Sequence, residues 1–335
     1  MGSMGTDATF YTIADAGFFP GLVALLNSLR LTGNSGDLVA LDRGLTTAQR
    51  RLLEGHVSLV ELPEAPAGSP ILLKPYPGAL GASGTIVLVD SDMIVTRSLA
   101  DIAALAGDGR ICAFPDPLPH RGRWFAEWEQ ELELRAPLRR RTYLNAGFLA
   151  LSTDHWPDLL GRWWELCERV PREQLFGRFE QPFWAGDQDV LNAILASEIP
   201  EEAIAELPAD GEAYPEDLLE AVVVDERTLR CELRGRPTSI LHYSLGPKAW
   251  ERKAWVRLRD DAYVRLLPRL LFGDDVAVRL DPKSVPFWLR PGAPARALVR
   301  GADLAHGGVR GAVHALPRPV LDRALALRNA VFRRL

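Results

Sequence analysis

Short apolar runs alternate with segments of helical periodicity along most of the chain. The runs, rich in β-branched residues, predict strands at residues 7–15, 36–42, 57–62, 85–90, 110–116 and 142–152, and a later strand that runs into a loop at residues 238–250. Between them, apolar residues at helical spacing predict helices at residues 20–33, 46–55, 98–105, 123–135, 155–169 and 187–197. This alternation predicts an α/β fold, a mostly parallel and doubly wound sheet with flanking helices.

The segments outside this alternation set the domain organisation. Residues 63–84 are rich in Pro, Gly and Ala, and we expect them to run over the surface. A chain of 335 residues allows one large domain or a domain with an appendage. We expect a main domain over residues 7–260 and a C-terminal extension with a basic helical tail over residues 261–335.

The predicted strand at residues 85–90 ends in two carboxylates. Ile86 to Val89 are apolar, which predicts burial on both faces, and Asp90 and Asp92 follow directly. Residues i and i+2 of an extended chain point to the same side, so the two carboxylates converge. Such a pair repels unless a cation neutralises it, and oxygen ligands favour hard ions, so we expect Mn²⁺ or Mg²⁺ here. Two aspartates that only cap the turn after the strand are the alternative.

A histidine ends the predicted strand near residue 240. His242 is followed by Gly246, which allows close approach of a ligand to the backbone, and by Lys248, whose charge suits a phosphate group. A lone histidine is more often a structural hydrogen-bonding residue than a ligand. As a third ligand beside carboxylates, imidazole suits Mn²⁺ better than Mg²⁺.

Two other segments place polar residues at unusual positions. The helix at residues 187–197 opens with Asp187 and Gln188, and an N-terminal cap accounts for the aspartate but not for the glutamine. Asn145 and two small residues interrupt a buried strand. Such an interruption indicates that a ligand approaches the backbone there.

Taken in chain order, these segments resemble the retaining glycosyltransferases of family 8, the glycogenin-like and bacterial galactosyltransferase-like enzymes. The five matching segments are TIADAGFFPGLVALLNSLR, IVLVDSDMIV, YLNAGFLAL, GDQDVLN and LHYSLGPKAW. The resemblance implies a GT-A fold and a nucleotide-sugar-binding catalytic domain over residues 7–260. It also implies metal-dependent transfer of a hexose, with retention of configuration, from a UDP-sugar to an acceptor hydroxyl.

The resemblance assigns roles to individual residues. It implies that Asp90, Asp92 and His242 hold Mn²⁺, or Mg²⁺, against the donor diphosphate. It implies that Asp187 and Gln188 are catalytic, with Gln188 near the anomeric carbon. The donor-binding residues that it implies are Asp15, Phe18, Lys74, Asp90, Ser91, Asn145, Ala146, Gly246 and Lys248.

The chain departs from the family pattern at a few positions. Gly17 stands where Asn is usual, Phe18 where Tyr is usual, and Ala249 where Pro is usual. The loop from His242 to Gly246 is also one residue longer than the pattern. These departures bear on uracil recognition and loop geometry more than on the metal.

Three other functions compete with this interpretation. A nucleotidyltransferase that makes nucleotide-sugars normally has a basic Gly-rich loop near its N-terminus, and TIADAGFFPG contains no Lys or Arg. A haloacid-dehalogenase-like phosphatase has Thr or Val where Ile94 stands, and its D-x-D lies near the N-terminus. A non-catalytic sugar-nucleotide-binding protein would not need Asp90, Asp92, His242 and Lys248 all intact.

The acceptor stays unidentified. A glycan, a lipid-linked sugar, a protein or a small metabolite would each supply a hydroxyl. Among the many aromatic residues of the central region, most suit core packing, and Phe183 and Trp184 are the candidates for acceptor contact because they precede Asp187.

Charge is unevenly distributed along the chain. The net charge is −5, but residues 286–335 hold nine Arg against two Asp, so the rest of the chain carries −12. An acidic main domain argues against nucleic acid as a partner. The tail suits an amphipathic helix on an anionic membrane surface. A helix packed on the domain or a homodimer contact fits equally well. The apolar residues of this tail are Val320, Leu321, Leu325, Leu327 and Val331.

Cysteine usage indicates the compartment. Cys112, Cys167 and Cys231 are far apart and odd in number, so they suggest a reducing environment rather than a disulfide framework. No signal peptide and no membrane-spanning apolar stretch is apparent. We expect a cytoplasmic protein, with peripheral contact at the inner face of the membrane if the tail binds lipid.

Overall fold

The computed structural model describes residues 8–62, 69–117, 123–244, 246–257, 259–292 and 294–301. Its centre is a seven-stranded sheet in the order β3-β2-β1-β4-β7-β6-β8. Neighbouring strands are parallel, except that β7 runs antiparallel to both β4 and β6. The strands are β1 (Thr9–Ala14), β2 (Leu38–Asp42), β3 (Ser58–Glu61), β4 (Thr85–Val89), β6 (Ile111–Pro115), β7 (Leu144–Ser152) and β8 (Ile204–Glu206).

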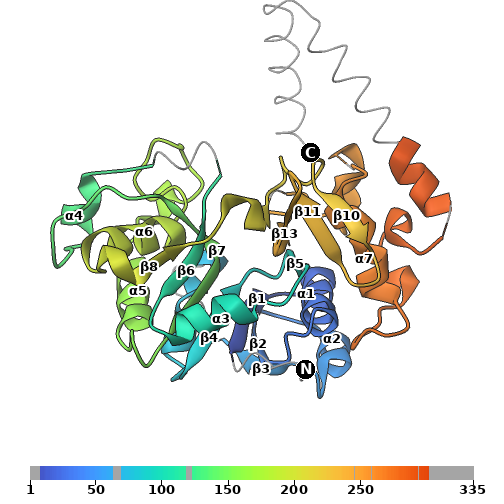
Figure 1. The fold of residues 1–335 in the computed structure, drawn as a ribbon, viewed down its shortest axis with the longest axis horizontal. Helices are drawn as coiled ribbons and strands as arrows, with labels where there is room; N and C mark the ends of the chain where they lie inside the picture. The colour runs from blue at the N-terminus through green and yellow to red at the C-terminus, as the bar shows by residue number, and fades with distance from the viewer. Residues whose placement is uncertain are drawn as a thin grey trace, which may run out of the picture.

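Helices cover both faces of this sheet (Figure 1). One core contains residues of α1, α3 and α7, and the other contains residues of α5 and α6. In β4, Val87 and Val89 belong to the first core while Ile86 and Leu88 belong to the second, so both faces of the strand are buried as predicted. The helices are α1 (Phe19–Leu31), α2 (Thr47–Leu53), α3 (Ala100–Gly107), α4 (Glu127–Glu131), α5 (Leu159–Cys167), α6 (Asp187–Ser197) and α7 (Ala262–Phe272).

Two small sheets lie beside the central one. In the first, β13 (Ile240–His242) runs antiparallel to β5 (Met93–Val95) and parallel to β9 (Glu212–Ala213). The second consists of β10 (Val222–Asp225), β11 (Arg230–Leu233) and β12 (Arg236–Pro237). Because β5 begins directly after Asp92, its pairing with β13 brings the chain near residue 242 to the end of β4.

Local sequence signals explain where the first helices start. Pro20 opens α1, a position where its missing N–H is not needed. Thr46 accepts a hydrogen bond from the Gln49 backbone, and the Gln49 side chain accepts one from Thr46 N in return. This capping box confirms the Thr cap expected for the second helix.

The helix predicted at residues 123–135 is wrong in extent. The structure has only the short α4, around the fully buried Trp128. Arg123 lies before it and is held by the carboxylate of Asp189 and the carbonyl of Phe179, which draws the chain away from a helical path. Leu132 is also fully buried, so the contacts of Arg123 rather than a lack of apolar residues limit the helix here.

The surface path predicted for residues 63–84 is also wrong where the structure describes it. Two 3₁₀ turns, Pro70–Leu73 and Tyr76–Gly78, pack against α5 and α6, and Leu72 and Leu73 are buried. This packing sends the side chain of Lys74 into the site described below. Sequence pattern alone did not predict β5, β8 to β12 or α7.

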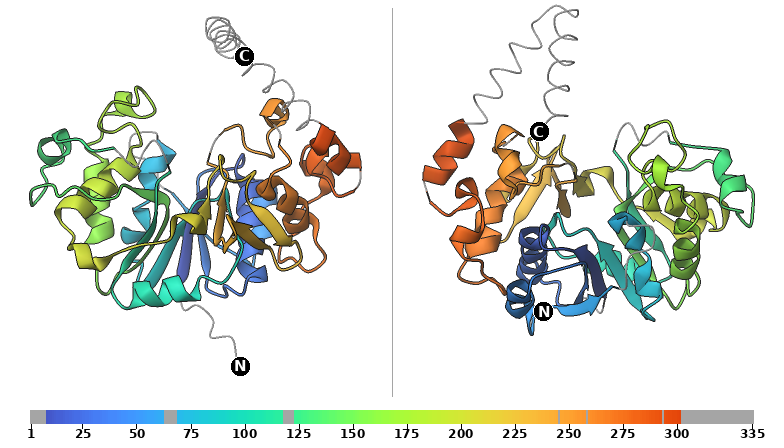
Figure 2. Two further views of the ribbon diagram at one scale, coloured as in Figure 1. Left: turned by 45° about the horizontal axis from the view of Figure 1, so that its top comes forward. Right: turned by 180° about the vertical axis from the view of Figure 1, so that it is seen from behind.

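The residues after 260 begin with a helix that shares the first core. Helix α7 packs against α1, and the two lie side by side in Figure 2. The Asn27 amide nitrogen donates to the carbonyls of Leu270 and Val278, at 2.7 Å each. The domain boundary at residue 260 stays a prediction, and the apolar tail residues Val320 to Val331 lie outside the described residues. In the described part of the chain, no helix has the length and apolar character needed to cross a membrane.

Candidate active site

A cavity of about 660 Å³ opens where β1 and β4 end. Strand order reverses at this point, since β2 and β3 lie on one side of β1 and β4 on the other. Ligands of open α/β sheets bind in such a crevice. The lining residues are Ile13, Ala14, Asp15, Phe18, Arg43, Ile71, Lys74, Asp90, Ser91, Asp92, Asp116, Pro117, Asn145, Gly147, Phe176, Trp184, Ala185, Asp187, Gln188, Tyr214, Glu216, His242, Ser244 and Lys248.

Asp90, Asp92 and His242 converge in this cavity. One ligand atom from each lies within 4.8 Å of the other two. His242 Nε2 is 3.5 Å from Asp92 Oδ1 and 3.9 Å from Asp90 Oδ2. The register of β5 and β13, in which His242 pairs with Met93, produces this approach. The donor set of two carboxylates and one imidazole fits a divalent cation such as Mn²⁺.

Gly147 explains why small residues interrupt β7. A Cβ atom at this position would lie 2.9 Å from Asp90 Oδ2 and 2.9 Å from His242 Cε1. The Gly147 carbonyl accepts a hydrogen bond from Asp90 N at 2.9 Å. The backbone of β7 therefore supports the metal-type cluster directly, and only glycine leaves room for it.

Two lysines, Lys248 buried and Lys74 half-buried, neutralise the carboxylates. Lys74 Nζ lies 2.9 Å from Asp90 Oδ1 and 3.5 Å from Asp187 Oδ2. Lys248 Nζ lies 2.6 Å from Asp92 Oδ2 and donates to the Tyr243 carbonyl at 2.7 Å. Burial alone would raise the pKa of Asp92, but Lys248 and the neighbouring imidazole lower it well below its usual range.

His242 has a carboxylate on each side. Its Nδ1 lies 2.8 Å from Glu212 Oε1, and its Nε2 faces Asp92. Burial alone would lower its pKa, but Asp92 and Glu212 together raise the pKa of His242 to about 10. No motif of the sequence indicates Glu212, which lies in the short strand β9.

The predicted catalytic residues open α6. The Gln188 Oε1 atom accepts from the Ala146 backbone at 2.9 Å, and its Nε2 donates to Asp116 Oδ2 at 2.7 Å. Burial raises the pKa of Asp187 to about 6 and that of Asp116 to about 7. Asp116, which the sequence analysis did not single out, thus fixes the glutamine that it faces.

Two of the expected donor-binding residues lie at the end of β1. Asp15 and Phe18 both line the cavity. Asp15 Oδ1 accepts hydrogen bonds from the backbone N–H groups of Gly17 and Phe18. The Phe18 ring lies edge-on to Trp250, with centroids 6.2 Å apart, and Lys248 Nζ is 5.5 Å from its centre. An aromatic face and a carboxylate therefore meet at this end of the cavity.

The remaining predicted donor contacts divide into two groups. Ser91 and Asn145 line the cavity, and Asn145 Nδ2 donates to Glu212. Ala146 is buried, and its N–H is bonded to Gln188, so it does not line the cavity. Gly246 is exposed and also lies outside the lining.

Aromatic rings form the rim above α6. Phe176 is 62% exposed and packs edge-on against Trp184, with ring centroids 5.8 Å apart. Both line the cavity. Phe183, expected as an acceptor contact, is fully buried in the second core and cannot contact a ligand. The accessible aromatic residue beside Trp184 is Phe176. Its high exposure could not be predicted from the sequence pattern.

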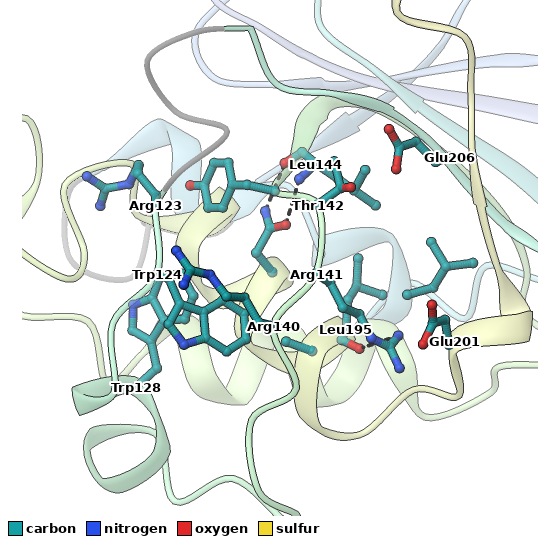
Figure 3. Close-up of a pocket in the computed structure, with 14 residues that line it drawn as sticks. Arg123, Trp124, Trp128, Arg140, Arg141, Thr142, Leu144, Leu195, Glu201 and Glu206 are labelled. Atoms are coloured by element: carbon teal, nitrogen blue, oxygen red, sulfur yellow. Dashed lines mark hydrogen bonds between the residues drawn. The ribbon is translucent and has the colours of Figure 1, made fainter.

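A second cavity, of about 430 Å³, lies further along α6. Figure 3 shows Arg140 next to Trp124 and Arg141 next to Glu201. Arg141 is thus the arginine that lies next to a carboxylate of the same cavity in this view. Among the described residues, the cluster able to hold a metal belongs to the first cavity, which is therefore the candidate active site.

Comparison with known proteins identifies the fold. No protein-family model matches the chain, and no curated protein matches its sequence. The structure is similar to galactosyltransferase LgtC in complex with donor and acceptor sugar analogs, with a TM-score of 0.52 and 18% identity over 77% of this chain and 95% of that chain. It is also similar to an active-site mutant of LgtC, with a TM-score of 0.51 and 19% identity over 73% and 90% of the two chains. The bifunctional glycosyltransferase WbbM in its apo form gives a TM-score of 0.52 and 13% identity over 83% and 51%. At these identities the likeness concerns the fold, and the chain has the GT-A fold of these glycosyltransferases.

Proposed function

We propose that this protein is a glycosyltransferase that moves a hexose from a UDP-sugar to an acceptor hydroxyl, with retention of configuration and with Mn²⁺ as its cation. One observation carries the proposal. Asp90, Asp92 and His242 meet at the carboxyl end of β4, inside a cavity that also holds two lysines and the start of α6. The GT-A fold supports this function, because LgtC with the same fold is described with donor and acceptor sugar analogs.

The proposed cation is held by the two aspartates and the Nε2 atom of His242. When bound, such an ion acts as a Lewis acid that neutralises charge on a leaving phosphate oxygen. Mg²⁺ is the second candidate ion, but the imidazole favours Mn²⁺.

The lysines act on the donor diphosphate. Lys248 is buried beside Asp92 and forms an ion pair with it. In the proposed complex, Asp92 holds the cation and Lys248 contacts the donor diphosphate. Lys74 bridges Asp90 and Asp187, so it lies between the phosphate side and the sugar side of the cavity. Fixed cations in a buried site stabilise developing negative charge without reorganisation.

Asp187 and Gln188 act on the sugar side. Breaking the bond to the diphosphate builds positive charge on the sugar ring, and a carboxylate and an amide oxygen stabilise it. Gln188 is held by Asp116 and by the Ala146 N–H, so its oxygen keeps one orientation. In the proposed retaining reaction the acceptor attacks from the face that the diphosphate leaves. The departing phosphate takes the hydroxyl proton, so no strong base is needed.

The two ends of the cavity fit the two substrates. Asp15 and the Phe18 ring suit the uracil base, and Ser91 and Asn145, which also line the cavity, are further proposed donor contacts. Phe176 and Trp184 offer an apolar surface on which an acceptor sugar ring can stack.

The proposed compartment is the cytoplasm, because all three cysteines are buried and unpaired. The membrane or homodimer contact proposed for the tail rests on its sequence pattern alone.

Donor cleavage tests this function. Wild-type protein and the Asp92→Asn variant are incubated with a panel of UDP-, GDP- and dTDP-sugars, with Mn²⁺ or with a chelator. We expect slow Mn²⁺-dependent hydrolysis of one UDP-hexose, lost at least 100-fold in the variant, as for removal of a major electrostatic contact. Activity that survives the chelator would contradict metal dependence. An inverted anomeric product by NMR would contradict retention.

A further inference from the structure

A buried carboxylate lies behind the histidine of the metal-type cluster. Glu212 in β9 is 1% exposed. Its Oε1 lies 2.8 Å from His242 Nδ1. Strands β9 and β13 are parallel, with Glu212 opposite Ile240, so the side chain two residues beyond Ile240 points to the same side as Glu212. The contact is therefore built into the pairing of the two strands.

The chemistry of this contact fixes which nitrogen faces the cation. An ionised carboxylate can only accept a hydrogen bond, so the proton between Glu212 and His242 belongs to Nδ1. When a cation displaces the second proton of the ring, Nε2 is the atom that donates a lone pair, and it is the atom that faces Asp90 and Asp92. A histidine ligand normally gives its other N–H to such an acceptor, which fixes its tautomer and ring orientation.

We propose that Glu212 is a positioning residue for the metal ion, holding His242 in the tautomer and orientation that present Nε2 to the cation. This inference rests on the proposed metal-dependent function and extends it to a residue that does not itself contact the ion.

The hydrogen bonds around Glu212 connect the metal side to the sugar side of the cavity. Asn145 Nδ2 donates to both carboxylate oxygens, at 2.9 and 3.1 Å. Asn145 Oδ1 in turn accepts from Gly147 N at 2.8 Å, which fixes the amide. Glu212 is thus held by two donors from two different strands, as a buried carboxylate requires. A displacement of this carboxylate would be transmitted to His242 and Asn145 together.

Manganese binding to the full chain, without any sugar nucleotide, tests the proposal. The free Mn²⁺ signal in electron paramagnetic resonance is titrated with wild type, Glu212→Gln and the control Glu216→Gln. The glutamine places an NH₂ group 3.1 Å from Asn145 Nδ2, donor against donor, in place of Glu212 Oε2. Glu216 is an exposed carboxylate that lines the same cavity, and it matches the loss of one negative charge. We expect Mn²⁺ binding to be 10- to 100-fold weaker in Glu212→Gln than in wild type. In the control, where only a screened charge is lost, Mn²⁺ binding should weaken less than about threefold.

The outcomes separate the inference from the proposed function. Equal weakening in both variants would assign the effect to charge alone and overturn the inference, as would unchanged affinity in Glu212→Gln. Absence of Mn²⁺ binding to wild type would instead overturn the metal site itself.

A measurement on wild type covers the case in which Glu212→Gln does not fold. Long-range ¹H–¹⁵N NMR of the His242 ring, with diamagnetic Zn²⁺ in place of Mn²⁺, reports which nitrogen is protonated. We expect a proton on Nδ1 and none on Nε2. A proton on Nε2 in the metal-loaded protein would overturn the proposal.

Discussion

At the scale of single residues, the site depends on contacts that leave no spare volume. Gly147 is the clearest case, because Asp90 and His242 of the metal-type cluster lie where its side chain would be. Gly161 in α5 is its opposite, with no atom within 4 Å of an added Cβ. The two glycines form a matched pair for separating steric effects on the site from ordinary helix propensity.

We expect Gly147→Ala to weaken Mn²⁺ binding about 5- to 150-fold, because overpacking typically costs about 1–3 kcal/mol. The Gly161→Ala control should leave Mn²⁺ binding unchanged and stabilise the fold by about 0.5–1 kcal/mol. Metal titration and urea unfolding of both variants check these values. Unchanged metal affinity in Gly147→Ala would refute the close approach of β7 to the metal-type cluster.

Residue patterns predicted the metal-type cluster but not the residues that support it. Asp90 and Asp92 stand out because charge follows a doubly buried strand, and His242 because it ends another. Asp116 also follows a fully buried strand, β6, but it was not singled out, and Glu212 carries no such signal. Each becomes important only through a contact with a residue distant in sequence, Glu212 with His242 and Asp116 with Gln188.

At the scale of elements, α7 shows how a cap can respond to pH. Asp261 caps this helix and accepts from Val264 N at 2.9 Å. Burial raises the pKa of Asp261 from 3.8 to about 7. A carboxyl group with a raised pKa binds its proton more tightly in the folded state. Its contribution to stability is therefore full below about pH 4 and is lost as the pH rises through 7.

Asp261→Asn removes this titration while keeping a capping side chain. We expect the variant to gain stability relative to wild type as the pH rises from 4 to 7, by on the order of 1 kcal/mol per pH unit. Urea unfolding of both proteins at pH 5, 6 and 8 measures the difference, in which other titrating groups cancel. A difference that stays constant with pH would disprove the assignment.

Helices and strands were predicted correctly where the pattern that specifies them lies within their own sequence. The strands of the first half and helices α1, α2 and α6 follow from apolar runs, caps and periodicity in their own sequences. Strands β5, β9 and β13 are three residues or fewer. The pairing of β13 with β5 joins segments more than 100 residues apart, and its pairing with β9 joins Ile240 to Glu212, 28 residues before it. No local pattern specifies such pairs. The predicted helix at residues 123–135 failed for a related reason, because the contacts of Arg123 with distant residues decide the path of the chain.

At the scale of the whole molecule, two groups of proposed substrate-binding residues lie on different elements around the central sheet. The end of β1 and the turn after it present Asp15 and Phe18, while β7 and α6 present Asn145, Asp187 and Gln188. The metal-type cluster lies between these groups, at the end of β4. This arrangement suits a ligand with a base at one end, a sugar at the other and a diphosphate in the middle.

Calorimetric titration of UDP into the protein, with Mn²⁺ or with a chelator, tests this central claim most directly. We predict that Mn²⁺ strengthens UDP binding by about 10- to 100-fold in wild type, a usual size for coupling between two ligands. We predict that this coupling disappears in Asp92→Asn. Equal UDP affinity with Mn²⁺ and with chelator, or a coupling that survives the loss of Asp92, would contradict the account.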